Sequence, residues 1–353
     1  MRCVQGSSCC SSFSALARGK TPFLAAACFL VVSTLAACLG EGSEETATPS
    51  PSATPHLSSP TVVTTVPVGA KPWGIDLNPV TNRIYVANEA SANVSVLDGA
   101  TDTVVATIPV GEGPMSVGVN PDTNRVYVAN AWSDTVSVID GSTDTVVATI
   151  PVGARPWAVG VNASANRIYV ANEGSDSVSV IDGGTDTVVA AIPVGQRPMA
   201  LAVEANSNRV YVANADSGDI SVIDGSTNAT VAIIEAGRAP WDVAVNLGTD
   251  SIYVANAESA LVTVIDRATQ TVVAQIPVGD VPQAVEVDPS TNRVFVANSF
   301  DDTISVIDGT TNTVVATVSV GSKPWDIAVN LDNGRIYVAN GGGSTVSVID
   351  GGS

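Results

Sequence analysis

The stretch Arg83-Ile-Tyr-Val-Ala-Asn88 decides the fold of this chain, because close copies of it follow at a fixed distance. Tyr-Val-Ala-Asn starts at Tyr85, Tyr127, Tyr169, Tyr211, Tyr253 and Tyr337, and Phe-Val-Ala-Asn starts at Phe295. Neighbouring copies are 42 residues apart without insertion, and seven such units nearly fill residues 61–353. A constant period of this length indicates a repeat architecture.

Each repeat contains four short segments with the alternation of a β-strand. In the first repeat they are Trp73–Asn78, Arg83–Asn88, Asn93–Asp98 and Thr103–Val110, separated by turn signals such as Asn-Pro and Asp-Gly. The 3.6-residue period of a helical solenoid is absent. Four strands per 42-residue unit predict the blade of a β-propeller. We therefore expect an all-β protein, a seven-bladed β-propeller with four-stranded antiparallel blades.

The two ends of the repeat region predict how the ring closes. Thr-Val-Val-Ala-Thr-Ile-Pro-Val-Gly follows the third strand in repeats 1–6 in recognisable forms, whereas the seventh repeat stops at Ser353 without it. A copy stands at the front, in residues 61–69. The N-terminal strand should therefore complete the seventh blade. The prolines inside this strand predict that it lies at the outer edge of each blade, where a missing N–H is tolerated. They are Pro67, Pro109, Pro151, Pro193 and Pro277.

The N-terminal region has the pattern of an export signal. Residues 1–37 combine three basic residues, no acidic residue and an apolar run from Phe23 to Ala37, which predicts a secretory signal peptide. The run is short for a membrane-spanning helix. Its end, Leu35-Ala36-Ala37-Cys38, resembles a bacterial lipobox, which implies lipidation of Cys38. An ordinary signal peptide and an uncleaved anchor are the alternatives.

The segment that follows Cys38 is rich in Ser, Thr and Pro. Residues 38–60 therefore read as a tether, which also holds the single histidine, His56. The predicted domains are a lipoprotein signal at 1–37, this tether at 38–60 and a propeller at 61–353. Together they predict an exported protein that is lipid-anchored to the bacterial cell envelope, either at the cell surface or on a membrane facing the periplasm.

Charge and composition exclude several functions. The chain has 15 Lys and Arg against 34 Asp and Glu, a formal charge of −19, which argues against nucleic acid as a partner. After residue 38 the charge is −22, so that only acyl chains would hold the protein to a membrane. From residue 57 onward there is neither His nor Cys, which excludes catalytic triads, Cys nucleophiles and zinc or haem sites with such ligands. We expect no cofactor and no metal.

The units NRIYVANE, TVSVIDG, TVVATIPVG and RPWAV resemble the YVTN-family (YncE-like) β-propeller repeat. Here Tyr-Val-Ala-Asn stands where the family motif has Tyr-Val-Thr-Asn. The resemblance covers residues 61–353 and implies a seven-bladed propeller in an exported or surface protein. It implies no single activity, because a fold does not define a function.

Positions shared by all repeats are expected to serve the fold. Pairing Asn88 with Asn93 places Arg83 opposite Asp98, and the spacing predicts cross-strand ion pairs on one rim of the ring. The equivalents are Arg125–Asp140, Arg167–Asp182, Arg209–Asp224, Arg293–Asp308 and Arg335–Asp350. The segment Asp98–Asp102 resembles a calcium loop, but its fifth position changes to Asn or Gln in later repeats. A turn is therefore the better interpretation.

Positions that differ between repeats gather on the opposite face, near the channel mouth. They supply basic residues and aromatic rings that suit a sugar or a protein partner. The candidate binding residues are Lys71, Trp73, Trp132, Arg155, Trp157, Arg197, Trp241, Phe300, Lys323 and Trp325. For Trp73 and its equivalents, packing between blades is the favoured interpretation and ligand contact is the alternative, because Trp73 shares the parity of the apolar Ile75 and Leu77. Trp132 and Phe300 lie in loops without an aromatic counterpart in the other repeats.

The sequence favours a non-catalytic binding protein of the cell envelope. We expect it to be a monomer that recognises a protein or a polysaccharide. A scaffold in a surface array is a second interpretation. The alternative is a carboxylate-based hydrolase or lyase at the central channel. Its acid and base would come from Asp76, Asp242, Glu286 and Asp326, on repeats 1, 5, 6 and 7, but no motif ties two of them together. We therefore assign no catalytic residue.

Overall fold

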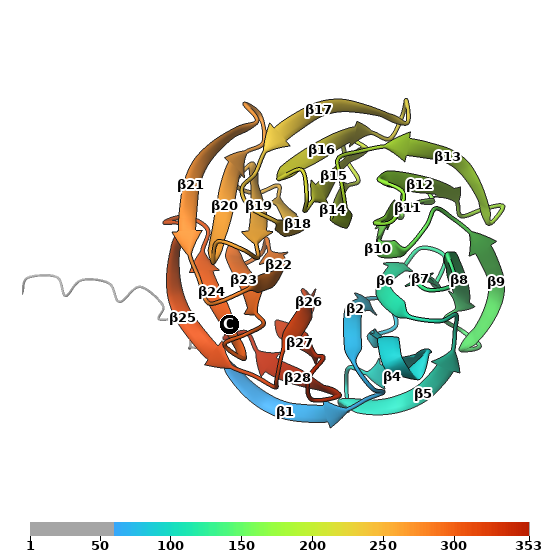
Figure 1. Cartoon of the computed structure of the whole chain (residues 1–353). Helices are drawn as coiled ribbons and strands as arrows, with labels where there is room; N and C mark the ends of the chain where they lie inside the picture. Colours follow the sequence, from blue (N-terminus) through green and yellow to red (C-terminus); the bar gives the residue numbers. More distant parts are fainter. Residues whose placement is uncertain (1–59, 353) are drawn as a thin grey trace, which may run out of the picture. The chain divides into compact units, whose positions relative to one another are not determined.

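A computed structural model describes residues 60–352, which form seven four-stranded antiparallel sheets arranged as a ring (Figure 1). The seven-bladed β-propeller predicted from the repeats is confirmed. In the first repeat the four strands agree with the predicted ones to within one residue. Residues 1–37, Cys38 and the tether up to residue 59 lie outside the described residues, so the signal, lipidation and tether remain predictions. Within the described part, no helix is long and apolar enough to span a membrane.

Each blade runs from the channel outward in chain order. The innermost strands are β2 (Pro72–Asn78), β6 (Pro114–Asn120), β10 (Pro156–Asn162), β14 (Pro198–Glu204), β18 (Pro240–Asn246), β22 (Pro282–Asp288) and β26 (Pro324–Asn330). The second strands are β3 (Arg83–Asn88), β7 (Arg125–Asn130), β11 (Arg167–Asn172), β15 (Arg209–Asn214), β19 (Ser251–Asn256), β23 (Arg293–Asn298) and β27 (Arg335–Asn340). A single 3-10 turn, η1 (Glu89–Ser91), follows β3.

The outer half of each blade has the same regularity. The third strands are β4 (Asn93–Asp98), β8 (Thr135–Asp140), β12 (Ser177–Asp182), β16 (Asp219–Asp224), β20 (Leu261–Asp266), β24 (Thr303–Asp308) and β28 (Thr345–Asp350). The outermost strands are β5 (Thr103–Pro109), β9 (Thr145–Pro151), β13 (Thr187–Pro193), β17 (Ala229–Glu235), β21 (Thr271–Pro277) and β25 (Thr313–Ser319), together with β1 (Thr61–Pro67). We number the blades 1 to 7 by their innermost strands, from β2 to β26.

The N-terminal strand closes the ring, as the sequence predicts. β1 pairs with β28 from Thr61 opposite Asp350 to Pro67 opposite Thr345, and completes blade 7 in the order β1-β28-β27-β26 (Figure 1). All seven outermost strands contain a register shift, and in β5 it leaves Val105 unpaired. These bulges, together with the prolines, make the edges poor templates for pairing with other chains.

The core consists of seven apolar clusters, each formed between neighbouring blades. Tyr85 of blade 1, for example, packs with Val117 and Val128 of blade 2 and is fully buried. The same holds for the Tyr or Phe of the other repeats. Because every blade buries its apolar side chains against the next one, removing a blade edge exposes core on both sides.

A second link between blades is a pair of asparagines at the inner end of five of the seven junctions. The side-chain amide of Asn78 in blade 1 donates to the side-chain oxygen of Asn124 in blade 2, at 2.8 Å. Four other junctions repeat this bond at 2.7–3.0 Å: Asn120–Asn166, Asn162–Asn208, Asn246–Asn292 and Asn330–Asn82. Asn78 also accepts hydrogen bonds from the turn that follows it, so that one residue fixes both the turn and the neighbouring blade.

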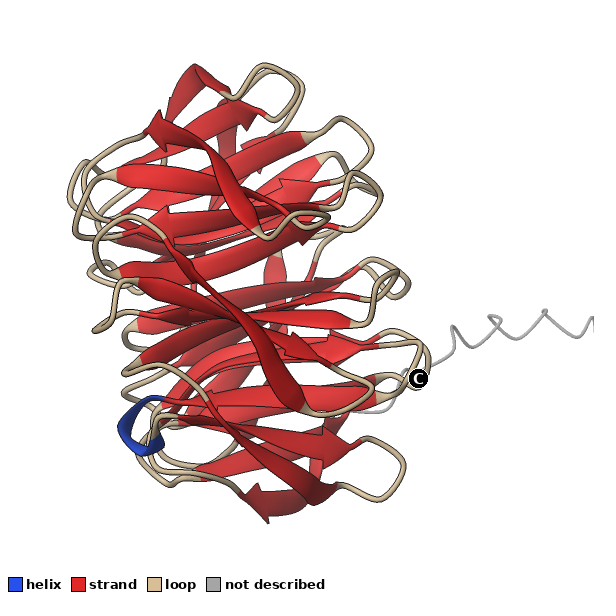
Figure 2. Cartoon of the chain, turned by 90° about the vertical axis from the view of Figure 1, so that its right-hand side faces the viewer, coloured by secondary structure: helices blue, strands red, loops and turns tan. Residues whose placement is uncertain are grey.

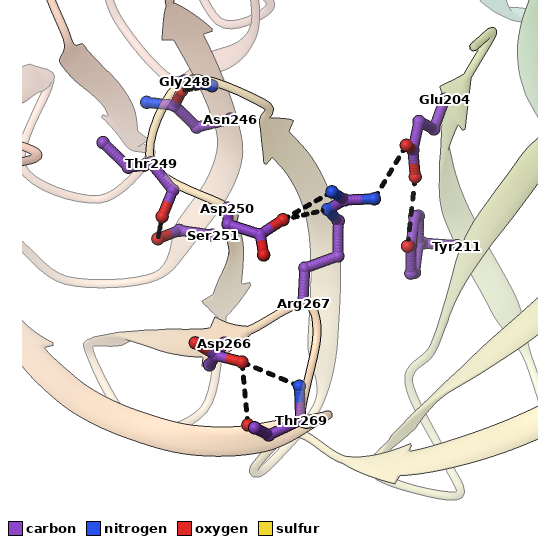
Figure 3. A network of polar contacts seen from close by, with 10 residues as sticks. All are labelled: Glu204, Tyr211, Asn246, Gly248, Thr249, Asp250, Ser251, Asp266, Arg267 and Thr269. Carbon is purple, nitrogen blue, oxygen red and sulfur yellow. Dashed lines mark hydrogen bonds and ion pairs between the residues drawn. The ribbon is translucent and has the colours of Figure 1, made fainter. Parts of the chain in front are cut away.

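The junction between blades 4 and 5 replaces this pair by a charged network (Figure 3). Glu204 and Asp250 occupy the two asparagine positions, and Arg267 stands where the other repeats have glycine. The Arg267 guanidinium lies 2.7 Å from a Glu204 oxygen and 2.5 Å from an Asp250 oxygen. The Tyr211 hydroxyl donates to Glu204 at 3.3 Å. Arg267 therefore neutralises two carboxylates that would otherwise repel each other.

The predicted ion pairs on the rim need a correction. Arg83 does lie opposite Asp98 in the register, but its guanidinium pairs at 3.4 Å with Asp144, which belongs to the outer turn of the next blade. Arg125–Asp186 and Arg335–Asp102 repeat this contact between blades. Only Arg167 pairs with the aspartate of its own hairpin. Its neighbouring blade has Asn228 at the position of Asp144, so the charged partner is missing there.

Candidate functional site

The two faces of the ring differ in what they present. We define the lower face as the one that holds the pairs Thr61–Asp350 and Arg83–Asp98. The repeated Asp-Gly turns lie on this face. The upper face holds the loops that lead from an outermost strand to the next innermost strand, here called crossover loops, and the upper turns between second and third strands. In Figure 2, η1 marks the upper face, and the C terminus lies on the opposite side.

Four tryptophans line a chamber at the centre of the ring. Trp73, Trp157, Trp241 and Trp325 begin the innermost strands of blades 1, 3, 5 and 7, and all border a cavity of about 500 Å³. The Trp73 and Trp325 ring centroids are 4.0 Å apart, and the Trp157 ring meets Trp73 edge-on at 5.4 Å. All four rings are half-buried, and Trp73 contacts both Trp157 and Trp325 at the upper end of the chamber. The structure places these rings along the channel wall and does not decide between ligand contact and packing between blades.

Trp132 and Phe300 occupy equivalent upper turns, in blades 2 and 6. They are exposed to 58% and 66%, the two most exposed aromatic side chains of the described region. The Trp132 ring covers Gly113, whose φ of +63° and lack of Cβ leave room for the indole. The turn itself is held by bonds from the Ala131 and Trp132 N–H groups to the crossover loop. One face of the indole is thus seated on backbone.

Most basic residues of the upper face are paired with acidic residues or lie against aromatic rings. Lys71 pairs with Glu89 at 3.3 Å and Arg155 with Glu173 at 3.1 Å. Arg197 approaches both Glu173 and Asp216 and lies 5.2 Å from the Trp241 ring centroid, while Arg155 lies 5.9 Å from that of Trp157. Lys323 has no ion pair within residues 60–352. A further pair on this face, Arg238–Glu258 at 3.5 Å, was not predicted from the sequence.

Four carboxyl groups line the same chamber. Asp76, Asp242, Glu286 and Asp326 border the cavity from blades 1, 5, 6 and 7. These blades are consecutive around the closed ring, because blade 7 adjoins blade 1. The carboxyl groups therefore form one group along about half of the channel wall. The four residues are far apart in the sequence. They become neighbours because closure of the ring brings blade 7 against blade 1.

Three of these carboxylates also join blades. Asp76 accepts the Leu77 N–H of its own strand at 2.7 Å and the Val119 N–H of blade 2 at 2.8 Å. Asp242 and Asp326 make the same two contacts to their own and the following blade. Glu286 accepts no hydrogen bond from a neighbouring blade within the described chain. Its carboxylate is therefore the one not fixed between two strands.

The chamber disfavours negative charge. Burial raises the pKa of Asp76 to about 6 and that of Asp242 to about 7, although the backbone N–H groups act in the opposite direction. Burial, and then the charge of Asp242, raises the pKa of Glu286 and of Asp326 well above the ordinary range. Because the charges of Asp242 and Asp76 raise the pKa of both Glu286 and Asp326, the four groups titrate as a coupled set.

These pKa values predict an unusual dependence of stability on pH. An Asp of the unfolded chain ionises near pH 4, whereas Asp76 and Asp242 keep their protons to about pH 6 and 7 in the folded state. The folded state thus binds more protons between these values, and the free energy of unfolding falls as the pH rises from about 4 to 7. We expect the protein to be more stable at pH 5 than at pH 8, by on the order of 3 kcal/mol.

Thermal unfolding of the full chain at pH 5, 6.5 and 8, at constant ionic strength, measures this effect. The variant D242N, which cannot ionise, should show a smaller change between pH 5 and 8. A melting temperature that stays constant or falls on acidification over this range would contradict the burial of these carboxylates.

Metal ligation is not supported in this chamber. Within residues 60–352 there is no group of three or more His, Cys, Asp or Glu side chains placed to hold a metal ion. In the turn Asp98–Asp102, both carboxylates already have partners in the protein. Asp98 accepts the N–H groups of Ala100 and Thr101, and Asp102 pairs with Arg335 of the neighbouring blade. This agrees with the interpretation of the segment as a turn.

The fold and the chamber define a seven-bladed β-propeller with an acidic channel beneath an aromatic mouth. A family model for the NHL repeat matches residues 322–349. Among solved structures, hydrazine synthase of Kuenenia stuttgartiensis is similar with a TM-score of 0.72 and 22% identity. That match covers 79% of this chain and 95% of the other, and it shows a shared fold. No curated protein matches the sequence.

Proposed function

We propose that this protein is a non-catalytic binding module of the bacterial cell envelope whose upper face recognises a partner. The observation that carries the proposal is the pair Trp132 and Phe300, which hold equivalent turns and expose most of their rings. Large exposed aromatic rings on one face are typical of recognition surfaces. Because these two positions are aromatic only in blades 2 and 6, the fold does not require them.

A polysaccharide is the partner that the geometry favours. The Trp132 indole rests on Gly113, so that its other face forms a flat platform toward solvent, which suits the face of a sugar ring. Charged side chains surround the channel mouth and can bind hydroxyl groups. A protein partner remains the other outcome of the test below.

Family membership, export and lipidation are part of the same proposal. The repeat motifs support membership of the YVTN family, and the N-terminal segment supports export and lipidation at Cys38. The described chain starts beside Thr61, which pairs with Asp350 on the lower face. The predicted tether would therefore join the propeller on the lower face, and no tether would be attached to the loops of the upper face.

A hydrolase or lyase at the channel is the second candidate. It is favoured by the contiguity of the four carboxyl groups and by pKa values of about 6 and 7 for Asp76 and Asp242, which suit general acid–base chemistry at neutral pH. This candidate predicts substrate turnover that is lost in D242N and in E286Q. The binding proposal predicts capture without turnover, and capture unaffected by either variant.

The test is capture from the solubilised envelope of the source cell by the immobilised full chain. We expect one glycan or one protein to be retained, and at least a tenfold loss of retention in W132A/F300A. The matched control is V80A/L331A, which removes exposed apolar side chains from the lower face. Equal retention by both double variants would contradict the role of the upper face. The chemical class of the retained material decides between polysaccharide and protein.

A further inference from the structure

The chamber beneath the tryptophans carries a charge imbalance that the proposed function does not use. Four carboxyl groups line it, and among residues 60–352 no Lys, Arg or His side chain does so. Buried carboxylates in proteins are normally paired with a cation or bound to a metal. Here the four carboxyl groups are half-buried. The described residues supply only backbone N–H groups to three of them, and Glu286 has no partner on another blade.

Gln283 adds an independent observation. It stands where the other blades have Trp or Met, and it lines the same chamber. Its side-chain carbonyl oxygen is buried and accepts no hydrogen bond from the described residues. Buried acceptors are nearly always satisfied, so this oxygen is a polar group of the chamber wall that the described residues leave without a donor.

The chamber is better matched by an organic cation than by a metal ion. Within the described part of the chain, the carboxylates are not grouped closely enough for three to hold one metal ion. The chamber walls carry four indoles, and Trp is the strongest partner for a cation over an aromatic face. Arg155 and Arg197 already lie 5.9 and 5.2 Å from the ring centroids of Trp157 and Trp241, so these rings accept cations.

The size of the chamber also limits the ligand. A cavity of about 500 Å³ holds a small molecule and not a polymer. We propose that the central chamber of this propeller binds a small organic ammonium ion, with Glu286 as the main counter-charge and the tryptophans around its alkyl groups. The site is separate from Trp132 and Phe300, and it goes beyond the binding of a partner by the upper face.

The test uses choline and 3,3-dimethylbutan-1-ol, which have the same shape but differ in charge. Titration calorimetry of the full chain at pH 8 should show binding of choline and at least tenfold weaker binding of the alcohol. E286Q keeps the shape of the side chain, removes its charge and is expected to lower choline affinity at least tenfold. The control D332N removes a carboxylate on the lower face and should leave affinity unchanged. Circular dichroism and a thermal melt establish that both variants are folded.

Three results would overturn the proposal. Equal binding of the two compounds would mean an apolar pocket only, and binding of Mg²⁺, Ca²⁺ or K⁺ that displaces choline would mean an inorganic cation site. Absence of choline binding would mean that the carboxyl groups are satisfied by their protons. None of these results depends on a partner from the cell envelope, so failure here leaves the capture experiment with W132A/F300A intact, and failure there leaves this site intact.

Discussion

A chain that begins at residue 70 should lose its cooperative unfolding transition. The deletion removes β1, the outermost strand of blade 7, and leaves the edge of β28 unpaired from Thr345 to Asp350. It also uncovers the cluster in which Val66 packs with Val346 and Val348. The loss should exceed about 5 kcal/mol, a large share of the stability of a typical protein. Calorimetry and denaturant unfolding measure the effect.

The repeat supplies a matched control for this deletion. In blades 1 to 6 one residue separates the position equivalent to Ser353 from the outermost strand, and in blade 1 that residue is Asp102. A permuted chain that begins at residue 70 and continues after Ser353 with one Asp and then residues 61–69 restores the same spacing. This chain should unfold cooperatively, near the melting temperature of the parent. An unchanged transition for the simple deletion would show that β1 does not close the ring.

The second large effect is expected at the junction of blades 4 and 5. Replacing Arg267 by glycine, the residue of the other repeats, leaves Glu204 buried beside Asp250 without a counter-charge. Breaking a buried ion pair from one side costs about 3–5 kcal/mol, because the remaining charge stays desolvated. The Glu204 side chain is only 4% exposed, so water cannot compensate. The R267G variant should therefore melt well below the parent in a thermal scan.

The neighbouring junctions show how this loss can be reversed. The triple variant E204N/D250N/R267G recreates the asparagine pair that joins Asn78 to Asn124 and Asn246 to Asn292. We expect the triple variant to recover most of the stability lost in R267G. A loss below about 1 kcal/mol in R267G, or a triple variant no more stable than R267G, would show that the network does not hold these blades together.

The strands were predictable because local and global signals agree in every repeat. Arg83–Asn88 has the β-branched and aromatic residues of a strand that is buried on both faces, and seven copies remove the ambiguity of a single short apolar run. Ring closure was predictable from the copy of the outermost strand at residues 61–69. The actual partner of Arg83 was not, because pairing of Asp144 with Arg83 depends on how two blades are placed side by side. Register within one hairpin contains no information about the neighbouring blade.

The candidate site shows the same contrast between what one repeat predicts and what depends on contacts between blades. Trp73 and Asp242 could be placed on innermost strands from the sequence. The sequence alone does not show that the four carboxyl groups are neighbours, because this depends on the contact between blade 7 and blade 1. Arg267 was missed because it breaks the repeat at a turn glycine, and its meaning needs the simultaneous changes at Glu204 and Asp250. Such coupled changes are physically interpretable once the three side chains are seen in contact (Figure 3).

Hydrogen–deuterium exchange of the full chain, with and without the material captured from the envelope, tests most directly whether the upper face is the recognition surface. We expect added protection at the upper turns 131–134 and 299–302 and at the crossover loop before Trp325. The lower turns, such as 78–83, should exchange at the same rate in both samples. Protection confined to the lower turns or to the outermost strands would contradict recognition through Trp132 and Phe300.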